Sequence, residues 1–255
     1  MTPAQPKVSV IVSTYNWPEA LELTIGSIGA QTRLPDEIVI ADDGSTDATR
    51  SLIARLQAAN AVPIRHIWHD DLGFRRTVIM NKAMAAATGD YLWFVNAGDE
   101  IFASDTVSRM MAAEPDADVY YGDTVMTDMQ GELIGRRRLA PPERLTWRSF
   151  SRGMLVSHQS FVARRTLCRP YDTAFRFSAD YGWCLDILRR SQRICNTHLT
   201  LSRFLDGGIT KQNIVPGLRE RFVIMKRNFG LMPTLAAHVP IACRFFAFWL
   251  TKGRF

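Results

Sequence analysis

Polar and acidic residues follow three short apolar segments in the first hundred residues of the chain. The apolar segments are residues 8–12, 38–40 and 91–95, and the polar segments after them are residues 13–16, 42–47 and 96–100. Buried parallel strands read as short apolar runs, and an open α/β sheet binds its ligands at the carboxyl ends of its strands. The spacing therefore predicts one ligand site at a single edge of a sheet.

The segment Asp42-Asp43-Gly44-Ser45 predicts a tight turn, because Gly44 supplies conformational freedom there. A carboxylate held in such a turn can accept a hydrogen bond from a nucleotide base or from ribose. The alternative is a capped turn before a helix. The segment Thr14-Tyr15-Asn16 alone would be an ordinary turn, but beside the first segment it favours a nucleotide pocket.

The segment 96–100, Asn-Ala-Gly-Asp-Glu, offers hard oxygen ligands of the kind that Mg²⁺ or Mn²⁺ uses when it bridges a diphosphate. Asp99 is the candidate ligand, and the alternative is that it caps the following helix. The sequence contains neither the glycine-rich dinucleotide loop nor the Walker lysine loop. This argues against a dehydrogenase and against an ATPase.

Helical patterns alternate with the apolar runs. Helices are expected over residues 18–31, from Thr46 or Asp47 through Leu56, and over 78–87 and 180–190; further strands are expected over 64–68, 119–123 and 161–162. This alternation predicts an α/β fold with a mostly parallel, Rossmann-like sheet flanked by helices.

The positive charge of the chain is concentrated near its end. Residues 219–255 hold seven basic residues and one acidic residue, which account for the whole formal charge of +6. We therefore expect a catalytic domain over residues 1–218 and a basic, apolar helical extension over residues 219–255. A basic, apolar tail favours contact with a membrane surface and argues against nucleic acid as the partner.

Residues 231–250 are apolar and aromatic, but Pro233, Pro240 and Arg244 disfavour a span across the bilayer. We expect an interfacial helix there, with packing on the catalytic domain or on a partner subunit as the alternative. The first apolar run reads as a strand rather than a leader, so a cytoplasmic location, peripheral on the inner face of the membrane, is expected. The four cysteines form no CxxC pair and are expected to be reduced thiols.

Several ordered motifs resemble those of family 2 glycosyltransferases over roughly residues 7–215. They are Thr14-Tyr15-Asn16, Asp42-Asp43-Gly44-Ser45-Thr46-Asp47, Met80-Asn81-Lys82, Gly89-Asp90-Tyr91, Asn96-Ala97-Gly98-Asp99, Tyr121-Gly122-Asp123, His158-Gln159-Ser160, Tyr171-Asp172, Ala179-Asp180-Tyr181 and Gly207-Gly208-Ile209.

The resemblance implies a GT-A fold and the transfer of a sugar, with inversion, from a nucleotide-diphosphate donor, for which we expect a UDP-sugar. The implied acceptor is a glycan or a lipid-linked sugar in bacterial surface-polysaccharide synthesis. The resemblance also implies a nucleotide-sugar site. Its members are Thr14, Tyr15, Asn16, Asp42, Asp43, Gly44, Ser45, Asn81, Lys82 and Asn96.

The same resemblance makes Asp99 the last acid of a metal-binding turn, with Mg²⁺ or Mn²⁺ as the expected cofactor. The family turn has two acids flanking one residue, whereas Asn96 and Gly98 occupy the earlier places here. A single carboxylate predicts weaker metal binding. His158 is the candidate for a second ligand, and a structural role in its loop is the alternative.

The resemblance makes Asp180 the catalytic base, because an attacking hydroxyl needs a carboxylate that takes its proton. Asp180 precedes a helix among aromatic residues that could stack on a sugar, and the alternative is an N-cap for that helix. The departing diphosphate needs a cation and a nearby basic side chain, for which Arg75, Arg76 and Lys82 are candidates.

Two other classes of protein stay open from the sequence. A sugar nucleotidyltransferase could use similar acids, but it would be expected to carry a glycine-rich basic loop near its start, which residues 13–18 lack. A noncatalytic module that binds nucleotide sugars would explain the incomplete acidic turn. Only a transferase would release nucleoside diphosphate in an acceptor-dependent way.

Overall fold

The computed structural model describes residues 5–69, 76–128, 130–207 and 213–240. The strands are β1 (Val8–Thr14), β2 (Glu37–Asp42), β3 (Ile64–Trp68), β4 (Tyr91–Phe94), β5 (Glu100–Ile101), β6 (Val119–Thr127), β7 (Leu133–Arg136), β8 (Phe161–Arg164) and β9 (Ile194–Leu205). The helices are α1 (Pro18–Gly29), α2 (Asp47–Ala59), α3 (Arg76–Ala86), α4 (Thr106–Ala113), α5 (Ala179–Arg190) and α7 (Ile214–Phe229), with short 3₁₀ turns η1 (Trp147–Arg152), η2 (His158–Ser160) and η3 (Arg165–Leu167).

Within the described residues, the strands form one mixed sheet in the order β3-β2-β1-β4-β8-β6-β9-β5, with β7 paired to β6. The first four strands are parallel, β8 runs antiparallel to both β4 and β6, and β9 runs parallel to β6. Thr14 at the end of β1 pairs with Asp42 at the end of β2. The register therefore brings the carboxyl ends of these two strands level with each other.

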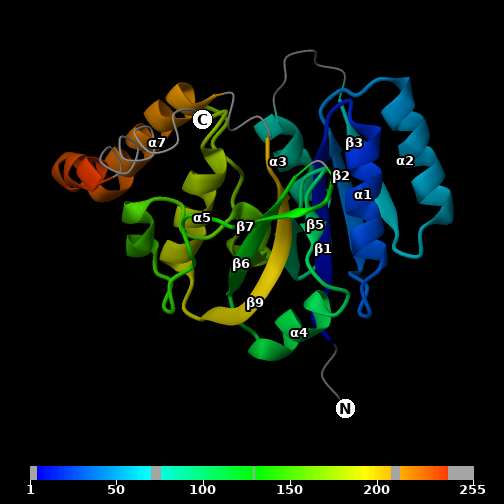
Figure 1. Ribbon diagram of the computed structural model, residues 1–255, viewed down its shortest axis with the longest axis horizontal. Helices are drawn as coiled ribbons and strands as arrows, with labels where there is room; N and C mark the ends of the chain where they lie inside the picture. The colour runs from blue at the N-terminus through cyan, green and yellow to red at the C-terminus, as the bar shows by residue number, and fades with distance from the viewer. Residues whose placement is uncertain (1–4, 70–75, 129, 208–212, 241–255) are drawn as a thin grey trace.

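The sheet buries both of its faces. On β1, Val8, Val10 and Val12 point into a core shared with α1, α2 and α4, while Ile11 points into a core shared with α3, α5 and α7. Alternating side chains of a strand point to opposite faces, so a fully apolar run is needed when both faces are covered. Figure 1 shows α1 and α2 at one end of the molecule and α5 and α7 at the other.

The architecture confirms the expected α/β fold. The strands over residues 8–12, 38–40, 64–68 and 91–95 are present, and α1 begins at Pro18 as expected. The cap of α2 differs from the expectation, because Thr46 stands at the N-cap without a side-chain cap bond. Its backbone N–H instead donates to Asn16 Oδ1 at 2.6 Å, which ties α2 to the end of β1.

Several elements were not expected from the sequence. They are α4, the short strands β5 and β7, the extension of β6 to Thr127, and the twelve-residue strand β9. Strand β9 pairs with β6 along most of its length and with β5 on its other side. It therefore joins the second half of the sheet to the segment just after β4.

The expected boundary after residue 218 lies inside helix α7. Ile224 and Met225 on this helix are buried in the core that contains α5. Residues 231–240 form a further helix, and the rest of the expected tail, residues 241–255, lies outside the described part of the chain. In the part that is described, no helix is both long enough and apolar enough to cross a membrane. Cys168, Cys184 and Cys195 carry free thiols.

Candidate active site

The two segments predicted to bind a nucleotide meet at the ends of β1 and β2. The Asp43 N–H donates to the Thr14 carbonyl at 3.1 Å, and the Asn16 N–H donates to Ser45 Oγ at 2.9 Å. Gly44 has φ of +88°, and a Cβ there would lie 3.3 Å from the His69 carbonyl oxygen. Glycine is favoured at this position because other residues rarely adopt positive φ.

The adjacent acids Asp42 and Asp43 have different surroundings. Asp42 is fully buried, and its carboxylate accepts bonds from the Ser45 N–H at 2.8 Å and from His66 Nε2 at 2.9 Å. Burial opposes ionisation, but these hydrogen bonds outweigh it and lower the pKa of Asp42. Asp42 therefore braces the turn. Asp43 lies 3.2 Å from His69 Nε2 through its Oδ1 atom.

Tyr15 and Thr14 differ in their exposure to solvent. The Tyr15 side chain is 48% exposed, so its ring presents an accessible face at the sheet edge. Thr14 is buried, and among the described residues its hydroxyl has no hydrogen-bond partner. An accessible aromatic face beside a turn rich in backbone donors and carboxylates suits a nucleotide base and its ribose.

The turn after β4 places Asp99 in the protein interior. Its Oδ1 accepts the Leu205 N–H at 3.1 Å, and its Oδ2 accepts from Gln159 Nε2 at 2.7 Å and from Asn96 Nδ2 at 3.3 Å. Burial raises the pKa of Asp99 to about 6, although these bonds oppose the shift. Gly98 has φ of +95°, and a Cβ there would lie 2.8 Å from Leu205 Cδ2.

Asn96 connects this turn to β1 and to α3. Its Oδ1 accepts from Ser13 Oγ at 2.7 Å and from Arg76 Nη2 at 2.5 Å. Arg76 is the first residue of α3 and is half-buried, and its Nε is buried without a partner among the described residues. A guanidinium group thus occupies the position beside the expected metal-binding turn.

The expected metal site rests on Asp99 alone among the carboxylates of the 96–99 turn. No group of three or more His, Cys, Asp or Glu side chains that could hold a cation occurs among the described residues. Both carboxylate oxygens of Asp99 and the amide oxygen of Asn96 already accept hydrogen bonds from the protein. A cation bound directly by the turn would compete with these donors for the same oxygens.

His158 lies in an aromatic cluster rather than beside Asp99's oxygens. Its Nε2 is 2.8 Å from the Tyr171 hydroxyl, and its ring stacks on Phe94 with the centroids 4.9 Å apart. Burial lowers the pKa of His158 to about 4, with the charge of Arg76 adding to the shift and that of Asp180 opposing it. The geometry supports the structural alternative for this histidine. It also places His158 within electrostatic reach of both Arg76 and Asp180.

Asp180 is the second residue of α5 and is half-buried, with the Tyr181 N–H donating to its Oδ1 at 2.8 Å. The neighbouring Arg137 has its pKa lowered to about 10 by burial and by the charge of Arg221, with Asp180 opposing this shift. Two guanidinium groups, from the segment after β7 and from α7, therefore lie near the candidate base.

Of the four aromatic residues around Asp180, which are Phe175, Phe177, Tyr181 and Trp183, only Phe177 is half-buried rather than buried. Phe175, Tyr181 and Trp183 are buried. The Tyr181 hydroxyl donates to the Phe150 carbonyl at 2.8 Å, and Trp183 Nε1 donates to the Arg169 carbonyl at 3.0 Å. These rings fix α5 in the core, because their faces are used in packing.

Two further residues predicted for the donor site lie on helix α3. The Asn81 side chain exchanges two hydrogen bonds with the backbone of Tyr171, at 3.0 Å and 2.7 Å, and so fastens that loop to α3. Lys82 is on the exposed side of α3. Arg75 lies outside the described residues.

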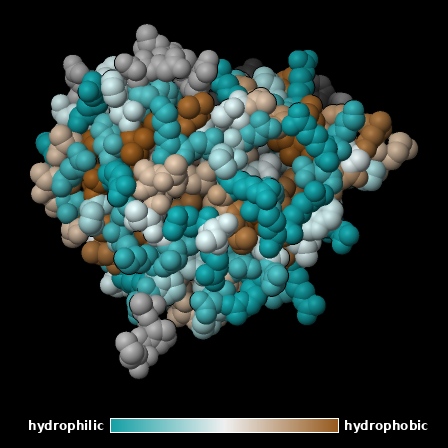
Figure 2. Space-filling model, turned by 180° about the vertical axis from the view of Figure 1, so that it is seen from behind, coloured by the Kyte–Doolittle hydropathy of each residue, from teal (hydrophilic) through white to brown (hydrophobic). Residues whose placement is uncertain are grey.

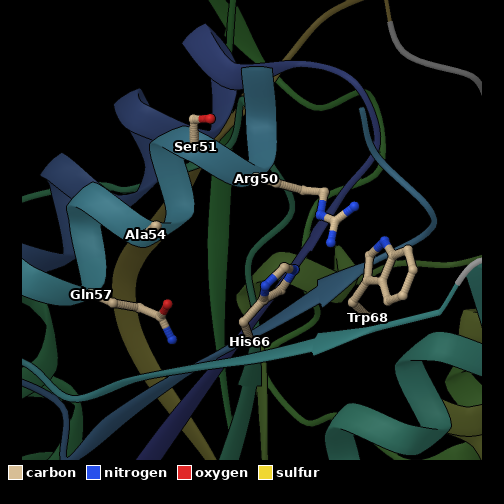
Figure 3. Close-up of a pocket in the computed structure, with 6 residues that line it drawn as sticks. All are labelled: Arg50, Ser51, Ala54, Gln57, His66 and Trp68. Atoms are coloured by element: carbon tan, nitrogen blue, oxygen red, sulfur yellow. The ribbon is translucent and has the colours of Figure 1, made fainter. Parts of the chain in front are cut away.

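A surface groove of about 490 Å³ lies between α2 and the edge strand β3. Figure 3 shows the side chains that line it: Arg50, Ser51, Ala54, Gln57, His66 and Trp68. The Arg50 guanidinium carbon lies 4.6 Å from the centre of the Trp68 ring. The residues that line the groove include none of the predicted donor-site residues, but His66 bonds to Asp42 and Trp68 pairs with Asp42 across β2 and β3.

Sequence reasoning missed Gln159 and Leu205 as partners of Asp99. Gln159 stands in the His158-Gln159-Ser160 motif, so its type and position were visible although its role was not. Leu205 acts through its backbone at the end of the unexpected strand β9, and no sequence signal marks it.

The fold is an α/β fold in which the predicted ligand-binding segments follow the carboxyl ends of the parallel strands β1, β2 and β4. Residues 9–171 match the model of "Glycosyl transferase family 2". A mycobacterial relative from Mycobacterium tuberculosis, the PGL/p-HBAD biosynthesis glycosyltransferase, is 34% identical over 187 residues, covering 71% of this chain and 69% of the relative. The chain belongs to glycosyltransferase family 2 and is a nucleotide-sugar-dependent glycosyltransferase.

Solved structures show the same fold at low sequence identity. The structure of Staphylococcus aureus TarS, residues 1–349, in complex with UDP-GlcNAc superposes with a TM-score of 0.69 at 19% identity, over 96% of this chain and 76% of that one. The mannosyltransferase PcManGT from Pyrobaculum calidifontis, in complex with GDP-Man and Mn²⁺, gives a TM-score of 0.63 at 17% identity, over 98% and 82% of the two chains. These likenesses confirm the GT-A fold.

Proposed function

We propose that this glycosyltransferase moves a sugar from a UDP-sugar to an acceptor hydroxyl with inversion at the anomeric carbon. The observation that carries the proposal is the level register of β1 and β2, which places Tyr15 and Asp43 side by side at the sheet edge. The complex of TarS with UDP-GlcNAc supports a uridine nucleotide, whereas PcManGT carries a guanosine nucleotide. UDP is therefore the first donor nucleotide to test.

In the proposed mechanism Asp180 is the base. The acceptor oxygen attacks the anomeric carbon and forms the new glycosidic bond, while its proton passes to the Asp180 carboxylate. The bond between the anomeric carbon and the diphosphate oxygen breaks, and the diphosphate leaves with the electron pair. The electrostatic influence of both Asp180 and Arg76 on His158 supports this, because both charges act on the same buried side chain.

We propose a glycan or lipid-linked acceptor in bacterial surface-polysaccharide synthesis. The name of the mycobacterial relative supports a glycolipid type of acceptor. The helix over residues 231–240 also exposes large apolar side chains, which are Leu231, Met232, Leu235 and Val239. Figure 2, which views the molecule from behind, shows apolar side chains at its projecting end.

The projecting helix and the basic residues of 219–255 support a peripheral position on the inner face of a membrane. Exposed apolar side chains gain free energy by burial in the headgroup region, and basic residues gain from anionic lipid. This position would place the cleft near a lipid-linked acceptor.

The test of the proposed function is an incubation of the chain with a panel of nucleotide sugars and candidate acceptors. We expect release of UDP that depends on the acceptor, together with a glycosylated product of inverted anomeric configuration. Release from a GDP-sugar alone would overturn the donor assignment, and retention of configuration would overturn the single-displacement mechanism.

A further inference from the structure

The oxygens of the 96–99 turn are committed to protein donors before any ligand binds. Asp99 accepts from Gln159 and from the Leu205 N–H through different oxygens, so neither oxygen of this buried carboxylate faces solvent unpaired. The amide oxygen of Asn96 accepts from both Ser13 and Arg76. A hard cation prefers carboxylate oxygens that it can contact directly, whereas the one carboxylate of this turn is buried and already accepts three hydrogen bonds from the protein.

The same bonds hold a permanent cation beside the turn. Arg76 is anchored by its Nη2 on Asn96 Oδ1, at 2.5 Å, while its Nε is buried without a partner among the described residues. Among those residues, no carboxylate forms an ion pair with this guanidinium. A half-buried guanidinium with an unused donor is costly unless a ligand supplies the acceptor.

We propose that Arg76 binds the donor's diphosphate and stabilises the charge that develops on it, in the role that a metal ion would otherwise have. Arginine presents its donors in a planar fork that matches phosphate oxygens, and it keeps its charge at any physiological pH. When the bond between the anomeric carbon and the diphosphate oxygen breaks, the leaving oxygen takes the electron pair, and Arg76 faces that negative charge.

This inference rests on the proposed function. It differs from the expectation based on the sequence, which was that Mg²⁺ or Mn²⁺ is the cofactor. Asp99 and Asn96 become positioning residues, because they hold the arginine and the strand ends in place instead of binding a cation. The transfer then needs no divalent cation.

The test compares the binding of UDP and of uridine by calorimetry, since the two differ only in the diphosphate. We expect the wild-type chain to bind UDP more tightly than uridine in the presence of EDTA, and Mn²⁺ to change this difference by less than about twofold. Arg76→Gln should weaken UDP binding by about 10- to 100-fold and leave uridine binding unchanged. Arg76→Lys should fall between them, because it keeps the charge without the fork.

Arg109→Gln is the matched control, because Arg109 is an exposed arginine on α4 that forms an ion pair with Asp105. It should leave both affinities unchanged. Thermal unfolding of each variant reports whether the fold is intact. If Arg76→Gln does not fold, Arg76→Lys and the wild-type measurements in EDTA still decide.

The possible failures are distinguishable. UDP binding that is lost in EDTA and restored by Mn²⁺, or an unchanged UDP affinity in Arg76→Gln, would overturn the role of Arg76 and leave the proposed function standing. If the wild-type chain binds neither UDP nor GDP, with or without Mn²⁺, the proposed function fails, and the role of Arg76 fails with it.

Discussion

Asp42 and Asp43 are adjacent at this sheet edge, but their carboxylates have different hydrogen-bond partners. The Asp42 carboxylate is hydrogen-bonded to the Ser45 N–H and to His66, and these bonds stabilise the turn. Asp43 is carried on the opposite side of the backbone, next to His69 and the end of β1. We therefore keep Asp43, rather than Asp42, as the predicted ligand for the base or ribose.

Replacement of Asp43 by alanine should weaken UDP binding by about 1.5–3 kcal/mol, because a hydrogen bond to a charged group is lost. Calorimetry with UDP measures this directly. Asp105→Ala, at an exposed position before α4, should have no effect. An unchanged affinity in Asp43→Ala would leave Asp43 with a structural role in the turn.

Replacement of Asp180 by asparagine should lower turnover by about 10² or more while UDP binding persists. Asparagine keeps the side-chain oxygen that accepts the Tyr181 N–H but cannot take the acceptor's proton. Asp186→Asn is the matched control, since Asp186 lies on the same helix and pairs with Arg190. Near-normal turnover in Asp180→Asn would exclude Asp180 as the base.

His158 should make the protein less stable as the pH falls. Its pKa is about 4 in the folded protein, below its ordinary value of 6.5, so between these values the unfolded chain binds a proton that the folded chain does not. The stabilising contribution is complete above pH 6.5 and is lost progressively down to pH 4.

We expect His158→Phe to be less stable than wild type at pH 7, because the bond to Tyr171 is lost, but to lose about 2–3 kcal/mol less than wild type between pH 7 and pH 4.5. Chemical unfolding at both pH values measures the difference. The opposite titration of Asp99 is present in both proteins and cancels. Parallel pH profiles of the two proteins would contradict a neutral, buried His158.

At the scale of elements, the strands that could be predicted are those that carry an apolar run in their own sequence. Strands β1, β2 and β4 are apolar along their length because both faces of the sheet are covered. Strand β9 mixes polar and apolar residues, and its burial comes from pairing with β6 and β5. The hydrophobic pattern of a single segment does not indicate which strands it pairs with, so β9 was not predicted.

The residues of the candidate site also differ in whether local sequence could identify them. The strand-end segments and Asp180 could be selected by residue type and spacing. The donors on Asp99 could not, because Gln159 and the Leu205 N–H come from 60 and 106 residues away. The surroundings of Asp99 are therefore set by residues of the second half of the sheet, which the local sequence of the turn does not show.

Helix α7 is joined to α5 through Glu220. Its carboxylate accepts the N–H groups of Arg176, Phe177 and Ser178, at 2.7–2.9 Å, just before α5 begins. A carboxylate at this position also interacts favourably with the positive end of the helix dipole. This contact fixes the segment that leads into Asp180.

Glu220→Ala should lower the free energy of unfolding by about 1–3 kcal/mol, because three backbone donors lose their acceptor. It should also lower turnover more than UDP affinity, since α5 carries the base. Denaturant unfolding and kinetics measure the two effects, and Glu132→Ala at an exposed loop position provides the comparison. Equal stability of both variants would show that α7 is not held through Glu220.

At the scale of the whole molecule, the donor-site segments and the projecting helix lie in different parts of the structure. The donor-site segments follow β1 and β2, whereas α7 and residues 231–240 project at the other end of the molecule (Figure 1). The basic residues of 219–255 carry the entire net charge. Nucleotide binding and surface attachment should therefore be separable.

A shortened chain that ends at Gly230 tests whether nucleotide binding and membrane attachment are separable. It keeps α7 with Ile224 and Met225 in the core, and it loses the helix over residues 231–240, which packs back through Thr234 and through the contact of His238 with Phe222. We expect the shortened protein to stay folded with its UDP affinity unchanged, because the donor-site segments lie far along the sheet from this helix.

The same shortened protein should no longer sediment with vesicles of anionic lipid. The full chain should bind them in a way that weakens with added salt without vanishing, because apolar burial persists when charges are screened. Met232→Ser with Val239→Ser, at two of the most exposed apolar positions, should weaken binding in the full chain without changing its fold. If the shortened protein unfolds or aggregates instead, residues 231–255 belong to the core or to a subunit interface, and the membrane assignment fails.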